Sequence, residues 1–182
     1  KVYAKETFHA MKSEVVNQMH EVKSSTAMSI IGKALEDKSE DVRKSALNGF
    51  RIIPKEMKST IERMLQDESY AIVTTALEKL SEAFPSEIPV FLEKVGNEIG
   101  HYAQIRIKAL EIRSGNGDAW ALDSLIDFTG PSHEFWTRRN AINALKRINT
   151  FNEKALWNML DASWNPNSRL ASTAVEALQY FA

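Results

Sequence analysis

The chain has 182 residues, of which 43% are hydrophobic and 26% charged, and its formal net charge is −1. This composition argues against a disordered chain, and so small a net charge gives no global field that would attract nucleic acid or an anionic membrane. Cysteine is absent, which excludes disulfides, thiolate metal sites and a cysteine nucleophile. No apolar run approaches the ~20 residues that cross a bilayer, so we expect a soluble protein with no membrane partner.

The first predicted element is an amphipathic helix. Between residues 5 and 20, apolar side chains recur at spacings of three and four, which is the period of a helix with one buried face: Phe8, Met11, Val15 and Met19. We expect a capping helix over residues 1–22. The chain starts with Lys1 rather than methionine and already within a helix-like pattern, which suggests a piece of a longer protein.

A short phrase beginning at Asp41 then returns four more times along the chain. Its central alanine recurs at intervals of about 32 residues, which is typical of stacked helical repeats. The anchor alanines are Ala46, Ala76, Ala109, Ala141 and Ala174, and the apolar residues that follow them are Leu47, Leu77, Leu110, Ile142 and Val175. We expect all ten to lie in the core, because closely crossing helices need a small residue at the contact.

Helix breakers divide the chain in the same places. Pro54 follows a helix expected to continue to Ile53, and Ser114-Gly115-Asn116-Gly117-Asp118 is the clearest turn. All five prolines fall at expected element edges. The sequence therefore predicts one all-α domain over residues 1–182 with five antiparallel helix pairs, at approximately 25–53, 54–84, 86–114, 117–149 and 151–182.

The phrase resembles the HEAT and HEAT-like repeat family. Val42-Arg43-Lys44-Ser45-Ala46-Leu47 and Ile105-Arg106-Ile107-Lys108-Ala109-Leu110 carry the resemblance best, because the family opens its second helix with a Val-Arg-x-x-Ala-Leu phrase. The match is partial, since Val73 and Ala171 replace the arginine and Thr137 replaces the aliphatic residue in other repeats. The resemblance implies an α-solenoid, a right-handed superhelix of about five helix pairs.

Two longer stretches, Asp67 to Glu78 and Gly117 to Leu145, are similar to the C-terminal helical repeats of aminopeptidase N family zinc peptidases. The catalytic signatures of those enzymes, His-Glu-x-x-His and Gly-Ala-Met-Glu-Asn, are absent here. The resemblance implies a non-catalytic accessory domain that packs on the catalytic part and shapes access to it. The parent chain would then be the zinc-dependent enzyme, and this segment would hold neither the zinc nor any other cofactor.

The residues themselves spell out no reaction. His20-Glu21 and His133-Glu134 begin the zinc-binding phrase, but neither has the second histidine that would complete it. Paired acids such as Glu36-Asp37 lie at predicted helix junctions, where they interact with helix dipoles and solvent. We therefore assign no catalytic and no metal-binding residue.

One cluster supports a different alternative. In Phe135-Trp136-Thr137-Arg138-Arg139-Asn140, aromatic residues adjoin arginines, a combination that suits phosphate contacts and base stacking. Its Trp-x-Arg-Arg phrase resembles HEAT-like DNA alkylation glycosylases. However, Arg138 matches Arg43 and Arg106 in repeat position, and a recurring arginine is more typical of hydrogen bonding between repeats. We therefore do not expect nucleic acid as the partner.

The remaining candidates are exposed positions of the second helices. In HEAT-like stacks these helices line the concave side, and their mixed charge here suggests a protein or peptide partner. The candidate interaction surface comprises Lys44, Asn48, Arg51, Glu78, Arg138, Arg139, Asn143 and Lys146. The partner would be the parent's catalytic domain or, if the chain is a free-standing HEAT-repeat scaffold, another protein. The sequence indicates neither the cellular compartment nor the oligomeric state.

Overall fold

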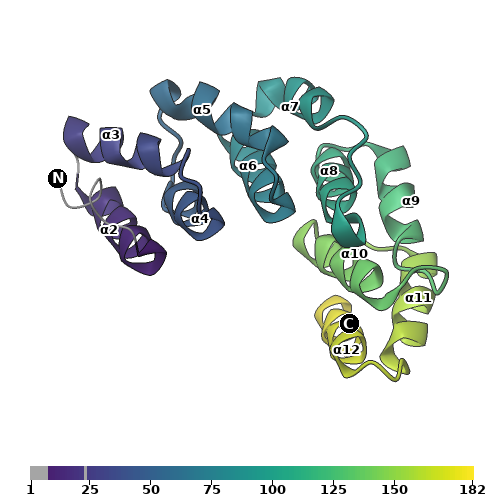
Figure 1. Cartoon of the computed structure of the whole chain (residues 1–182). Coiled ribbons are helices and arrows are strands. Elements are labelled where there is room, and N and C mark those ends of the chain that lie inside the picture. The colour runs from purple at the N-terminus through teal and green to yellow at the C-terminus, as the bar shows by residue number, and fades with distance from the viewer. Residues whose placement is uncertain (1–7, 23) are drawn as a thin grey trace. The chain divides into compact units, whose positions relative to one another are not determined.

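The computed structural model describes residues 8–22 and 24–182, and Figure 1 shows that these residues form a series of helices. Within these residues there are eleven α-helices and no strand, which confirms the all-α prediction. The α-helices are α2 His9–Glu21, α3 Ser25–Ala34, α4 Glu40–Asn48, α5 Lys58–Arg63, α6 Tyr70–Ala83, α7 Ile88–Val95, α8 Gln104–Gly115, α9 Ala119–Asp127, α10 Phe135–Arg147, α11 Glu153–Ser163 and α12 Ser168–Phe181. Four short 3-10 turns, η1 Lys55–Met57, η2 Met64–Gln66, η3 Pro85–Glu87 and η4 His101–Ala103, precede or extend α-helices.

The chain divides into two compact units, Lys1–Gly96 and Asn97–Ala182. The division falls within the predicted third repeat, so α7 belongs to the first unit and α8 to the second. Gly96 and Gly100, on either side of this division, have φ values of +63° and +71°. Such values are readily available only to glycine.

In the first unit, neighbouring helices along the chain pack on one another (Figure 1). Helix α2 contacts both α3 and α4, α4 contacts α6, and α6 contacts α5, η2 and α7. The buried side of α2 differs from the predicted one. Val16 is fully buried, whereas Phe8 and Met11 are 67% and 54% exposed. Val15 and Met19 are half-buried, so the predicted face is wrong only at Phe8 and Met11. Helix α2 contacts α3 and α4, and its one fully buried residue is Val16.

In the second unit, the helices α8, α10 and α12 are the second helices of successive pairs, and each contacts the next. Helix α10 packs against α8 and α12, while α9 and α11 lie against α8 and α12 respectively. The apolar core of this unit is continuous from Ala103 in η4 to Ala177 in α12.

Four of the five anchor alanines lie where the sequence predicted. Ala46, Ala76, Ala141 and Ala174 are fully buried. Ala109 is an exception, because it is only half-buried. Among the residues that follow the anchors, Leu47, Leu77, Leu110 and Ile142 are buried as predicted, but Val175 is 42% exposed.

The exception at Ala109 has its origin at the start of α8. Tyr102 and Ala103 both have φ near +53°, a left-handed conformation that changes how the chain enters the helix. Ile107 and Lys108 consequently occupy the buried side, at 2% and 9% exposure. The buried side of α8 thus includes Ile107, Lys108 and Glu111, and Ala109 lies outside it.

The end of α4 also differs from the prediction. The helix ends at Asn48 rather than continuing to Ile53. Gly49 follows as its C-cap, and Ile52 is 83% exposed in the loop. The apolar Ile52-Ile53 pair therefore does not extend the helix, although Ile53 itself is buried.

Candidate functional site

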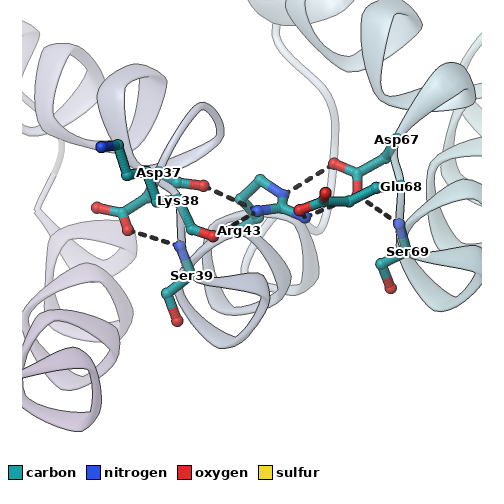
Figure 2. Close-up of polar contacts among 7 residues, drawn as sticks. All are labelled: Asp37, Lys38, Ser39, Arg43, Asp67, Glu68 and Ser69. Carbon is teal, nitrogen blue, oxygen red and sulfur yellow. Dashed lines mark hydrogen bonds and ion pairs between the residues drawn. The ribbon is translucent and has the colours of Figure 1, made fainter.

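Arg43, on α4, links its own repeat to the next one (Figure 2). Its Nη1 donates to the carbonyl oxygens of Asp37 and Lys38 at 2.9 and 3.1 Å, both in the loop before α4. Its Nε and Nη2 donate to the two carboxylate oxygens of Asp67 at 2.8 Å each, and Nη2 also approaches Glu68 at 3.5 Å. This two-pronged geometry is the strongest form of arginine–carboxylate contact. The Asp67 carboxylate raises the pKa of Arg43 above its usual value.

Arg138, on α10, has the same kind of environment. It is 3% exposed, and its Nε donates to the Thr129 carbonyl at 2.9 Å. Its Nη2 donates to the Asn158 carbonyl at 3.2 Å and to the Asp161 carboxylate at 2.7 Å, and both of these residues lie on the next helix, α11. Arg138 therefore joins repeats as Arg43 does, and it does not belong to the exposed surface in which we had placed it.

Arg106 does not continue this pattern. It is half-buried at the start of α8, and its guanidinium lies 5.7 Å from the ring centroid of Trp120, which is itself 56% exposed. The buried side of α8 differs from that of α4 and α10, because it includes Lys108 and Glu111 in place of the arginine and the anchor alanine.

Each unit carries a groove among its described residues. The groove on the first unit has a volume of about 360 Å³ and is lined by Leu35, Glu36, Asp37, Arg43, Thr60, Arg63, Met64, Asp67 and Glu68. Its arginines are already occupied, because Arg43 pairs with Asp67 and Arg63 pairs with Glu36. Internal pairing leaves this groove little charge with which to recognise a ligand.

The groove on the second unit, between α10 and α12, has a volume of about 290 Å³. Its lining is polar and comprises Arg139, Asn143, Ser168, Arg169, Ser172, Thr173 and Glu176. Side-chain caps fix the starts of both helices. Glu134 accepts from the Thr137 backbone N–H at 2.9 Å at the start of α10, and Asn167 accepts from Arg169 at 3.1 Å at the start of α12.

Trp136 lies against two arginines that line this groove. The guanidinium carbons of Arg139 and Arg169 are each 5.4 Å from the centroid of its ring. Arg139 is held in place because its Nε donates to Thr173 Oγ1 at 3.3 Å. The ring of Tyr102 lies 6.0 Å from that of Trp136. Cations at these distances are attracted to the face of an indole ring.

The candidate surface residues fall on both units, and each unit is described by itself. In the first, Lys44 and Asn48 are exposed on α4, Arg51 is exposed beyond its end, and Glu78 is half-buried on α6. Asn48 uses its backbone carbonyl to accept from Lys79 Nζ at 3.4 Å.

In the second unit, Arg139, Asn143 and Lys146 lie along α10. The first two line the groove, while Lys146 pairs with Glu176 of α12 at 3.6 Å. Arg169 belongs to the same site, and we did not identify it from the sequence. Its spacing of seven residues from Glu176 on one helix was the available signal.

The described part of the chain holds no group of three or more His, Cys, Asp or Glu side chains arranged to bind a metal ion. In that same part, none of the helices combines the length and the apolar character needed to cross a membrane.

Comparisons with known proteins identify no family. No family model matches the sequence, and no curated protein matches it. Among solved structures, the chain is similar to a designed armadillo repeat protein, with 15% identity over 99% of this chain and 97% of that one, at a TM-score of 0.44. So distant a likeness assigns no function. The helix pairs themselves define the class, and the chain is a helical repeat protein.

Proposed function

We propose that this chain is a non-catalytic helical repeat scaffold that binds a protein or peptide through the groove between α10 and α12. The observation that carries this proposal is the polar lining of that groove, where Arg139, Asn143 and Arg169 come from two successive second helices. Amide and guanidinium groups suit the carbonyls and side chains of a peptide. The buried residues of α10 and α12 supply the core that fixes the groove's geometry.

A narrower form of the proposal makes the partner the catalytic part of a zinc aminopeptidase. It rests on the resemblance of residues 67–78 and 117–145 to the accessory repeats of such enzymes. Reading the native gene upstream of the Lys1 codon tests it. An open frame encoding His-Glu-x-x-His with a downstream glutamate would support the accessory role, and a start codon at or just before Lys1 would contradict it in favour of a free-standing scaffold.

The nucleic-acid alternative loses its main feature in the structure. It needed Arg138 and Arg139 side by side at the surface, and Arg138 is buried among Thr129, Asn158 and Asp161. We therefore do not propose it.

Site-specific photo-crosslinking tests the proposal in its broader form. A photoreactive amino acid replaces Asn143 in the groove. The matched control places the same amino acid at Asp123, an exposed residue of α9 that lies outside the groove. In native cells we expect Asn143 to crosslink one protein reproducibly and Asp123 not to crosslink it. Adding Arg139→Ala should weaken that crosslink. Crosslinks from Asp123 alone, or from neither position, would contradict the proposal.

A further inference from the structure

Within the described residues, three arginines of the second unit make no ion pair with a carboxylate, namely Arg106, Arg139 and Arg169, and the last two share one aromatic ring. Ion pairs to carboxylates occupy Arg43, Arg63, Arg113, Arg138 and Arg147. Within residues 8–22 and 24–182, neither Arg139 nor Arg169 makes such a pair, and both lie against Trp136 instead. A guanidinium placed over an aromatic ring keeps N–H groups available along its edge, because those groups lie in the guanidinium plane.

The surroundings of the two arginines keep the site positive. Glu176 is the acidic residue among those that line the groove, and its carboxylate pairs with Lys146. The hydroxyl of Thr173 already makes two hydrogen bonds within the chain, because it accepts from Arg139 and donates to the backbone carbonyl of Arg169 at 2.9 Å. These bonds fix Arg139 from one side and leave the exposed Arg169 facing solvent.

We propose that the Trp136–Arg139–Arg169 cluster binds a carboxylate side chain from an acidic segment of the partner protein. This inference rests on the proposed function and names the chemistry of the partner at the same groove. Two guanidiniums around one site match a carboxylate, which can accept two parallel N–H bonds. Asn143 and the serine hydroxyls further along the groove supply donors and acceptors for the backbone of that segment.

A nucleic acid fits the same groove less well. Its phosphates recur every few ångströms, so binding draws on a stripe of basic residues rather than one pair. Among the residues that line the groove, the cations are Arg139 and Arg169, and the whole chain carries a net charge of −1.

Titration of the full chain with a defined probe tests the inference. The probe is a fluorescein-labelled peptide that contains six glutamates, measured by fluorescence anisotropy at low and at physiological salt. The neutral control probe replaces each glutamate with glutamine. We expect the glutamate peptide to bind and the glutamine peptide not to bind. Arg139→Ala with Arg169→Ala should weaken binding about tenfold or more, because two charge-assisted contacts are lost.

Matched variants separate the site from general charge. Lys33→Ala with Lys55→Ala removes the same two charges from exposed positions of the first unit and should change the dissociation constant less than twofold. Arg169→Ala alone, at an exposed residue, tests the site without touching the bond between Arg139 and Thr173. Circular dichroism of each variant verifies that it is folded.

The outcomes distinguish this inference from the proposed function. Equal binding by wild type and the double arginine variant, or no binding of the glutamate peptide, would overturn the inference. If the Asn143 crosslink nevertheless persists, the scaffold function stands with a partner of different chemistry. A single-stranded oligonucleotide of matched charge that binds more tightly than the peptide, and that depends on Arg139 and Arg169, would also overturn it in favour of nucleic acid.

Discussion

His20, on α2, is a titratable group in an unfavourable position for a charge. Its Nε2 is buried without a hydrogen-bond partner, its ring lies edge-on to Phe50 at 4.9 Å, and a Cβ added at Gly49 would lie 2.0 Å from that ring. Burial lowers the pKa of His20 below its usual value, and the nearby Lys79 acts in the same direction. The nearby Ala46 backbone and the charge of Glu21 oppose this without reversing it.

Stability should therefore fall as the pH falls through the unfolded-state pKa of His20, about 6.5. The folded state keeps His20 neutral there while the unfolded state takes up a proton, so the contribution is complete above that pH. The loss of stability is at most about 1.4 kcal/mol for each unit by which the two pKa values differ, and solvent around the half-buried ring makes it smaller. Urea unfolding between pH 8 and pH 5 measures this, with His20→Phe as the control that removes the titration. Identical pH profiles for the two proteins would contradict the prediction.

At the same scale, local patterns predicted some positions and not others. The buried alanines at 46, 76, 141 and 174 followed from spacing alone, because the small residue at a helix crossing is a local requirement. Ala109 did not follow, since the left-handed Tyr102 and Ala103 set the rotation of α8 and neither is a glycine or asparagine that would have signalled it. Arg169 beside Trp136 depends on how α10 packs against α12, which no single helix encodes.

At the scale of elements, the arginine near the start of a second helix fixes the next repeat. The recurrence of arginine in the sequence predicted this role, because the same residue at one repeat position meets the same neighbours. Its acceptors were not predictable, since Asp67 and Asp161 lie in different parts of their repeats, one after η2 and one within α11.

We expect Arg43→Met to destabilise the protein by about 2–4 kcal/mol, because it leaves two backbone carbonyls and the nearly buried Asp67 carboxylate without their donor. Arg51→Met is the matched control, since Arg51 is exposed in the loop after α4, and it should change the stability by less than about 0.5 kcal/mol. Urea denaturation at neutral pH compares the two. Equal stabilities would show that the Arg43 bonds contribute nothing net to the fold.

At the scale of the whole molecule, the second unit has an apolar core of its own. Its buried residues form one cluster that begins in η4 and includes Ile107 and Leu110 of α8 before it continues through α9 to α12. A helical repeat array is stabilised by contacts between neighbouring repeats, so a fragment that keeps such a set of contacts should fold without the rest.

We therefore expect residues 97–182 alone to be helical and to unfold cooperatively in urea. The control fragment, residues 119–182, lacks η4 and α8 and so loses the part of the cluster that covers α9 and α10. It should be less stable than the longer fragment or unfolded, because a missing neighbour exposes one apolar face. Far-ultraviolet circular dichroism reads out both. An unfolded 97–182 fragment, with the full chain folded, would mean that the second unit's core depends on residues before Asn97, and equal stability of the two fragments would remove α8 from that core.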